Sequence, residues 1–194
     1  MPNPVSLEGH VVGFPHPGDP KTEGFVFSVK AATDGVVHEL QVGGPYADEQ
    51  VLEAIAGMAS LVMAARTHNA LVKLYYEERG LENARQKIMT QITVHNWRPG
   101  QNSGETLGNP GYGRVFSLFV ASSGNPWANL GMVFDHGGGM AYMETDSHSV
   151  TTPQRLLELL AALVSAYTVG FKVYVTYTPR PNNSPLIDKV SLLP

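Results

Sequence analysis

The segment His-Gly-Gly-Gly at residues 136–139 has the residue pattern of the loop that stabilises the oxyanion in lipases. In those enzymes the loop acts together with a G-x-S-x-G turn, which carries the nucleophilic serine, and with a later histidine. No G-x-S-x-G pattern occurs anywhere in the 194 residues. We therefore interpret residues 136–139 as a glycine-rich hairpin turn rather than as part of a catalytic site.

Two aspartates and two histidines flank the same hairpin. Asp135 and His136 lie on one side of it, and Asp146 and His148 lie on the other. If the hairpin brought all four to one end, they would form a set of ligands for a divalent metal. Exposed polar residues at loop ends explain the pattern equally well, and the chain has no cysteine for thiolate ligands or disulfides. We expect no metal and no other cofactor.

The most ligand-like stretch is GNPWANLG at residues 124–131. An exposed Trp127 would stack on the apolar face of a sugar or on a base, and the amide of Asn129 would supply directional hydrogen bonds. Tyr142 and Glu144 are two residues apart on an expected strand, so they share one of its faces. We predict that these four residues form a ligand-binding surface. The alternative is that Trp127 fills the core or an interface between subunits.

The overall charge and composition restrict the classes of function. The formal net charge is −4 and the chain has 13 lysines and arginines in total, which argues against an electrostatic grip on nucleic acid or on anionic membranes. No apolar run reaches the length of about 18 residues that a membrane span needs. Paired carboxylates, an activated nucleophile and a phosphate-binding loop are absent as recognisable sets. We expect no nucleic-acid partner, no membrane insertion and no enzymatic activity.

The elements that would position these residues recur along the chain. With a shift of 101 residues, AARTHNALVKLYY at 64–76 matches SAYTVGFKVYVTY at 165–177. In each segment an apolar helical pattern ends at a residue that tolerates the left-handed conformation, Asn69 or Gly170, and an alternating strand pattern follows. Downstream, MTQITV at 89–94 resembles IDKVSL in the second half. The repeated pattern predicts that one small unit occurs twice.

The pattern of each half therefore predicts three strands, then a helix, then two strands. The helices are expected at 48–68 and 152–169, and each follows a hairpin, the first of which turns at Asp34-Gly35. A further strand is expected before each hairpin, at 10–14 and at 114–121. We divide the chain into a first half at 1–96, a linker at 97–111 that is rich in Gly, Asn and Pro, and a second half at 112–194.

The second half resembles a known family. Its segment 151–193 runs from a long apolar helix through Ala-Tyr-Thr-x-Gly into Lys-Val-x-Val, passes a loop rich in Pro and Asn, and closes with Ile-x-x-Val-x-Leu. This resembles the B subunits of AB5 toxins of the subtilase-cytotoxin and pertussis-like type, and residues 48–94 are similar more loosely. The resemblance implies a bacterial OB-like barrel with one helix, which assembles as a pentameric ring and binds cell-surface glycans.

We expect an α+β fold made of two tandem OB-like small antiparallel barrels or sheets, each with one helix. The alternative is a single domain in which one continuous sheet wraps around two helices, as in a double hotdog fold. Both expected helices are apolar around much of their circumference, and one small sheet cannot cover such a helix. The uncovered face predicts contact with the other half or with another chain, and hence a homo-oligomer, in its most specific form a ring of tandem units.

The function expected from these observations is a non-catalytic, lectin-like module that presents several copies of one shallow glycan site. The alternatives are an intracellular scaffold, a phage or viral component, or a sponge for a small nucleotide, with Lys172, Arg180 and Arg114 as its positive residues. A hotdog-type thioesterase or dehydratase, with its site across a dimer, is a further alternative. A lectin would be secreted as a mature chain, whereas the absence of cysteine favours a reducing compartment such as the cytoplasm.

Overall fold

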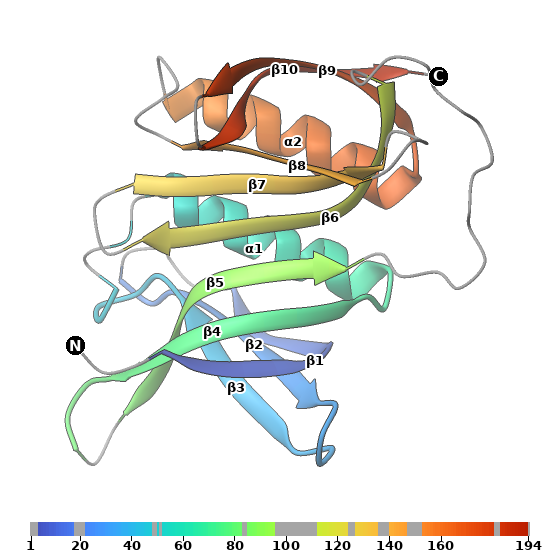
Figure 1. Cartoon of the computed structure of the whole chain (residues 1–194). Coiled ribbons are helices and arrows are strands. Elements are labelled where there is room, and N and C mark those ends of the chain that lie inside the picture. The colour runs from blue at the N-terminus through green and yellow to red at the C-terminus, as the bar shows by residue number, and fades with distance from the viewer. Residues whose placement is uncertain are drawn as a thin grey trace.

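A computed structural model describes the chain in ten stretches, and within them it forms ten strands and two helices (Figure 1). The described residues are 4–17, 22–47, 50, 52–82, 85–95, 112–123, 127–135, 140–146, 153–180 and 183–193. In chain order the elements are β1 (Val5–Pro17), β2 (Phe25–Ala31), β3 (Val37–Val42), α1 (Leu52–Thr67), β4 (Leu71–Arg79), β5 (Gln86–His95), β6 (Tyr112–Ser123), β7 (Trp127–Asp135), β8 (Met140–Asp146), α2 (Pro153–Val169), β9 (Lys172–Arg180) and β10 (Asn183–Leu193).

The first five strands close into a small barrel. β1 pairs antiparallel with β2 and with β4, β2 pairs with β3, and β4 pairs with β5. A parallel contact between Gln41 of β3 and Ile88 of β5 completes the ring of pairings. The expected α+β class with a small closed barrel is therefore confirmed.

The second five strands have the same set of pairings. β6 pairs antiparallel with β7 and with β9, β7 pairs with β8, and β9 pairs with β10. The parallel contact here joins Glu144 of β8 to Leu186 of β10. In both halves the helix connects the third strand to the fourth, so each element of the first half has a topological counterpart in the second.

Two irregularities of each half fall at corresponding places, whereas the shifts between Gly13 and His16 and between Asn183 and Leu186 have no counterpart. Where the first strand of each half pairs with the second, an extra residue interrupts the register, Val12 in β1 and Phe116 in β6. Where the fourth strand pairs with the fifth, the extra residue is Thr90 in β5 and Asp188 in β10. β-bulges bend a strand and increase its twist, so the two halves curve at equivalent positions.

Both helices end as the sequence predicts. Asn69 follows α1 with φ 48°, and Gly170 follows α2 with φ 79°. Both values lie in the left-handed region, which glycine reaches without steric cost and asparagine reaches more easily than most residues. The Gly170 amide donates to the Ala166 carbonyl at 2.8 Å, which satisfies one of the free carbonyl groups at the end of the helix. The predicted change from helix to strand at these two residues is confirmed.

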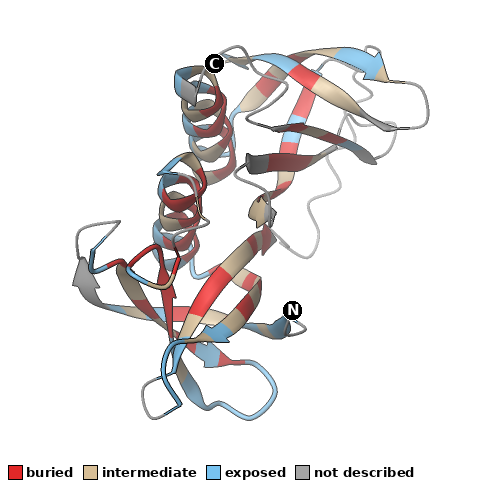
Figure 2. Cartoon of the chain, turned by 90° about the vertical axis from the view of Figure 1, so that its left-hand side faces the viewer, coloured by how far each residue is buried: buried red, intermediate tan, exposed pale blue. Residues whose placement is uncertain are grey.

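The two halves are joined by strand pairing, which we call the internal junction. Residues 91–95 of β5 pair antiparallel with residues 117–121 of β6, so all ten strands belong to one sheet. The alternative expectation of one continuous sheet with two helices agrees with this connection. Each set of five strands nevertheless also closes on itself through its own pairings. Figure 1 shows α1 behind β6 and β7 and α2 behind β8, and Figure 2 shows buried positions along both helices and the strands that face them.

The internal junction also covers the second side of α1. This helix packs on β1, β3 and β5 of its own half and on β6, β7 and α2 of the other half. Gly57 lies at the closest approach, because a Cβ at this position would be 3.1 Å from Val120 of β6 and 3.2 Å from Leu160 of α2. Most of the apolar surface of α1 is therefore buried within the chain, although Leu52 and Met63 stay exposed.

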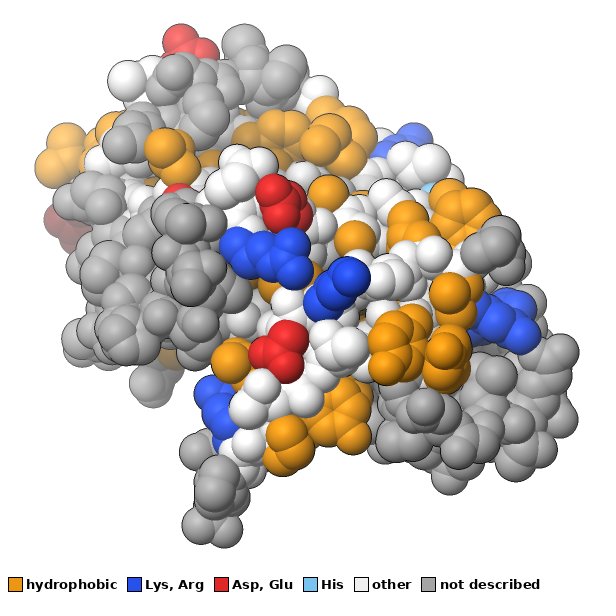
Figure 3. All heavy atoms as spheres, turned by 90° about the horizontal axis from the view of Figure 1, so that it is seen from above, with side chains coloured by type: hydrophobic (Ala, Val, Ile, Leu, Met, Phe, Trp, Pro, Cys, Tyr) orange, Lys and Arg blue, Asp and Glu red, His pale blue; other side chains and the backbone are white. Residues whose placement is uncertain are grey.

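Several large apolar side chains stay exposed on the second half. Val169, Phe171 and Leu192 lie at the turn between α2 and β9 and near the end of β10. The view from above shows hydrophobic side chains at the surface beside lysine, arginine and acidic groups (Figure 3). Contiguous exposed apolar surface of this kind marks sites of interaction in soluble proteins.

Candidate functional site

Three strands of the second half bring one set of side chains to their outer face. The register pairs Phe119 of β6 with Gly131 of β7, and Gly131 with Glu144 of β8. Side chains alternate between the two faces of a strand, and the residues adjacent to these three are buried in the core: Leu118, Val120, Leu130, Met132, Met143 and Thr145. Phe119 and Glu144 therefore face away from the helices, with Gly131 between them.

Two aromatic rings lie parallel on this face. The rings of Phe119 and Tyr142 have centroids 5.8 Å apart and an interplanar angle of 1°. Gly131 makes room for the arrangement, because a Cβ at this position would overlap the Phe119 ring. The Tyr142 side chain remains 39% exposed. The result is an aromatic surface that a flat apolar group of a ligand can contact.

Glu144 connects this aromatic pair to a positive charge. The Tyr142 hydroxyl donates to Glu144 Oε2 at 3.1 Å, and Arg180 Nη2 donates to Glu144 Oε1 at 2.7 Å. The Arg180 and Glu144 side chains are 27% and 36% exposed, so solvent screens their ion pair and reduces its contribution to stability. We call Phe119, Tyr142, Glu144 and Arg180 the outer-face site.

The Tyr142 hydroxyl stays protonated over a wide range of pH. Burial raises the pKa of Tyr142 above its usual range, and the negative charge of Glu144 and its hydrogen bond to the hydroxyl raise that pKa further. Arg180 acts in the opposite direction but does not cancel the effect. Tyr142 is thus held as a neutral donor beside an ionised acceptor, which suits ligand binding rather than proton transfer near neutral pH.

The four residues predicted from the sequence are placed unequally. The structure brings Tyr142 and Glu144 into direct contact, as their spacing indicates. Asn129 occupies the register position between Ala121 and Asp146, and Trp127 pairs with Ser123, but the side chains of Trp127 and Asn129 lie outside the described part of the structure. The prediction for these two residues therefore stays a prediction.

Sequence reasoning missed two members of the outer-face site. Phe119 was not singled out, and Arg180 was assigned only to the nucleotide alternative. Both reach the site across strands, Phe119 through the pairing of β6 with β7 and Arg180 from the end of β9. The pattern of a single strand shows which residues share its face, but it does not show which residues of another strand lie opposite.

The hairpin between β7 and β8 does not bring its two aspartates close together. Asp135 pairs with Met140, whereas Asp146 pairs with Asn129. Six residue positions of β7 separate the two pairs, which corresponds to about 20 Å along the strand. The register places the two aspartates at opposite ends of the hairpin, so the possibility that they contribute to one metal site is not supported. Residues 136–139 and His148 lie outside the described residues.

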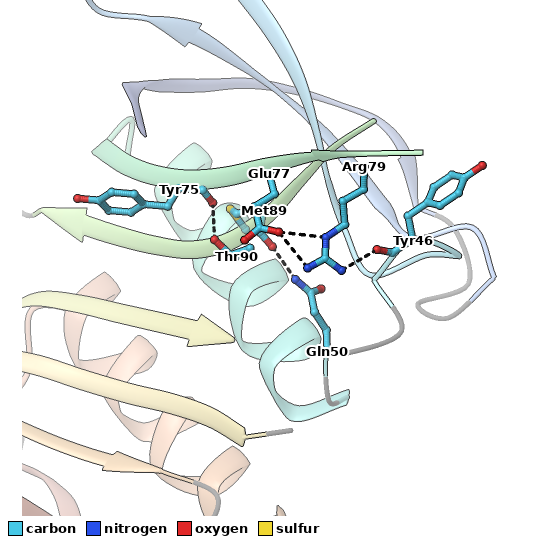
Figure 4. Close-up of polar contacts among 7 residues, drawn as sticks. All are labelled: Tyr46, Gln50, Tyr75, Glu77, Arg79, Met89 and Thr90. Carbon is cyan, nitrogen blue, oxygen red and sulfur yellow. Dashed lines mark hydrogen bonds and ion pairs between the residues drawn. The ribbon is translucent and has the colours of Figure 1, made fainter. Parts of the chain in front are cut away.

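In the first half, the side chains at the corresponding positions form hydrogen bonds and ion pairs with other residues of the chain (Figure 4). Arg79 matches Arg180 at the end of its strand, but it donates to Glu77 at 2.9 Å and to the Tyr46 carbonyl at 3.2 Å. Gln41 forms the parallel contact that Glu144 forms in the second half, and it is only 5% exposed. Its Nε2 donates to the carbonyl groups of Glu23 and Gly43.

Gln50 completes this network and ties a loop to the barrel. It accepts from the Gly43 amide at 3.1 Å and donates to the Met89 carbonyl at 2.7 Å. Thr90, the extra residue of β5, donates to the Tyr75 carbonyl at 3.2 Å. The equivalent positions of the first half therefore hold the connection between β3 and α1, while those of the second half leave Tyr142 and Glu144 accessible.

No metal site and no membrane helix is found in the parts of the chain that the structure describes. Their histidines, aspartates and glutamates form no group of three or more that could hold a metal ion. Neither α1 nor α2 has the length and apolarity needed to cross a bilayer. No family model, no curated protein and no solved structure matches the chain.

Proposed function

We propose that the chain is a non-catalytic binding module whose outer-face site binds a carbohydrate. The observation that carries this proposal is the parallel pair of Phe119 and Tyr142 beside Glu144, whose two carboxylate oxygens each hold one hydrogen bond. A sugar ring offers an apolar C–H face that packs on aromatic rings and hydroxyl groups that pair with carboxylates. An ionised carboxylate has about four lone-pair sites, so Glu144 keeps capacity for ligand hydroxyls.

The charge at the site favours a neutral ligand over a nucleotide. Glu144 lies between Arg180 and the aromatic pair, so an anion that approaches Tyr142 also meets the carboxylate. The chain has a formal net charge of −4, which further disfavours phosphate-bearing ligands. We therefore place the nucleotide sponge second and use it as the contrasting outcome of the test.

The proposal includes a tandem duplication. Each half would be one OB-like barrel, over residues 1–96 and 112–194, joined by residues 97–111. The equal pairings, the bulges at Thr90 and Asp188 and the strand-end Arg79 and Arg180 support this view. The resemblance to AB5 B subunits is the reason to choose cell-surface glycans as the first ligands to test. Several weak sites on one oligomer would raise avidity without new contacts.

A glycan array combined with thermal-shift screening against nucleotides tests the function. The wild-type protein is expected to bind a subset of glycans, and Tyr142→Ala and Glu144→Gln are expected to lose that binding while they remain folded. Tyr75→Phe, a change on β4 of the first half, is the control and should bind normally. A silent array together with a melting shift produced by a nucleotide would contradict the carbohydrate proposal.

A further inference from the structure

One edge of β10 has no neighbouring strand within the described part of the chain. Residues 189–193 pair with β9 on one side, and the parallel contact with β8 lies earlier, at Leu186. The corresponding residues of the first half, 91–95 of β5, pair with β4 on one side and with β6 on the other. Residues 189–193 therefore present an open backbone edge at the place where the sheet of the first half continues.

The side chains at this edge are apolar at the same alternate positions. Ile92 and Val94 of β5 are buried at the internal junction, and Val190 and Leu192 hold the corresponding positions of β10. Val94 is 0% exposed, whereas Leu192 is 42% exposed. The difference follows from the missing neighbour, because the internal junction covers Val94 with Leu118 of β6.

Two further apolar residues extend the exposed surface. Val169 is 63% exposed and Phe171 is 40% exposed. Both lie at the turn from α2 into β9, and the next residue, Lys172, pairs with Leu193 at the end of β10. Val169 and Phe171 thus lie near the end of β10, on the side of β9, and together with residues 189–193 they form what we call the β10 surface. An apolar strand edge of this kind accepts another strand readily.

The opposite end of the sheet does not offer a matching edge. Residues 13–17 of β1 correspond to the stretch of β6 at the internal junction, and among the described residues they pair with β2 alone. This stretch contains Pro15 and Pro17, which have no N–H to donate. Proline on an edge strand is a common protection against pairing with another chain. Head-to-tail contact of β10 with β1 is therefore disfavoured.

We propose that the β10 surface forms a two-fold interface with a second copy of this chain, in which residues 189–193 of the two copies pair antiparallel. At the corresponding residues of β5 the internal junction holds an antiparallel strand, and two-fold contacts are the commonest among soluble homo-oligomers. The inference deepens the proposed function, on whose oligomeric part it rests, and it replaces the ring with a dimer.

The outer surface of α2 carries a charged pair on the same side. Arg155 and Glu158 hold the positions that correspond to Ala54 and Gly57, with which α1 faces the internal junction. In a two-fold dimer the α2 helices of the two copies run antiparallel on the side of the added strand. Within each chain Arg155 already pairs with Glu158 at 3.1 Å and donates to the Asp188 carbonyl at 3.1 Å, so these charges are satisfied without the second copy.

Mass measurement by light scattering is the first test. The wild type is expected at about 42 kDa, twice the chain mass of 21.0 kDa, and Leu192→Lys is expected at 21.0 kDa while it remains folded. Met63→Lys, on the exposed side of α1, is the matched control and should stay dimeric. Phe14→Lys on β1 should also stay dimeric. Dissociation by Phe14→Lys, or a monomeric wild type at all concentrations, would overturn the proposal.

A single introduced cysteine tests the two-fold geometry directly. Ser191 is the central residue of 189–193, so in an antiparallel pair it lies opposite its own counterpart, and the natural chain has no cysteine to interfere. Mild oxidation of Ser191→Cys is expected to give a covalent dimer, and Ser6→Cys on β1 is expected to give none. A Ser191→Cys protein that stays uncrosslinked while the wild type is dimeric would refute this interface. Monomeric Leu192→Lys is expected to bind glycan in solution with an unchanged Kd. This measurement tests the glycan site independently of the dimer interface.

Discussion

The ring of Phe119 lies over Gly131, on the neighbouring strand, and reaches the ring of Tyr142 on the strand beyond it. The absence of a side chain at Gly131 therefore determines whether the two aromatic rings can be parallel. This relationship links one backbone position to the shape of the whole outer-face site, and it can be broken without touching any residue proposed to contact the ligand.

Gly131→Ala is expected to displace the Phe119 ring and to weaken glycan binding about tenfold or more. The added methyl group overlaps the ring, and overpacking of this kind costs about 1–3 kcal/mol of stability. Gly13→Ala on β1 is the control, because a Cβ there meets nothing within 4 Å. Chemical denaturation and ligand titration of the two variants measure both effects. Equal binding by both variants would show that the aromatic pair is not needed.

Alkaline pH is expected to destabilise the fold through Tyr142. The pKa of this tyrosine in the folded chain lies above its ordinary value of 10.0, so the folded state favours the protonated form. The stabilisation is fully present below pH 10.0 and is lost as the pH rises toward the pKa of the folded state, because only the unfolded chain ionises freely in that range. Tyr142→Phe should flatten the loss of stability above pH 10.0, measured by urea denaturation across pH. A slope identical to that of the wild type would contradict the assigned environment.

The end of α2 offers a test of backbone strain alone. Gly170 has φ 79°, and a Cβ at this position would meet nothing within 4 Å. Gly170→Ala is therefore expected to cost about 1–2 kcal/mol through the left-handed conformation and not through a clash. Asn69→Gly, at the equivalent end of α1, should instead leave stability equal or slightly higher. Thermal and urea denaturation measure both changes, and a neutral Gly170→Ala would show that the turn adopts another conformation.

Gln50 should be important for the stability of the first half. Gln50→Glu keeps the size of the side chain but replaces the donor that faces the Met89 carbonyl with an oxygen, which leaves the carbonyl without this partner. The expected cost is about 1–3 kcal/mol. Gln86→Glu, at an exposed position of β5, is the control and should change stability by less than about 0.5 kcal/mol. Indistinguishable denaturation midpoints for the two variants would show that the hydrogen bond of Gln50 does not contribute to the stability of the first half.

Local signals in the sequence predicted the elements well. Helix ends at Asn69 and Gly170, the hairpin at Asp34-Gly35 and the alternation of the strands all depend on neighbours in the chain, and each has its counterpart in the structure. The exposed face shared by Tyr142 and Glu144 was predictable for the same reason. These features follow from local backbone preference and from the two-residue period of a strand.

Long-range register was not predictable in the same way. The internal junction pairs strands on either side of a long connection, and the placement of Phe119 over Gly131 depends on which residue of β6 lies opposite which residue of β7. Alternation is satisfied equally by a register shifted by two residues, so it does not distinguish them.

The coverage of α1 by both halves has a consequence for folding. Because Val120 and Leu160 of the second half pack against Gly57, neither half can unfold without exposing apolar surface of the other. The two barrels are therefore coupled thermodynamically, and the chain should melt in one cooperative transition even though its topology divides in two. Cutting the chain between the barrels would not yield two independent folded units but two fragments with an uncovered side each. Similar pairings in the two halves and cooperative behaviour coexist here, because the helix of the first half belongs to the core of both halves.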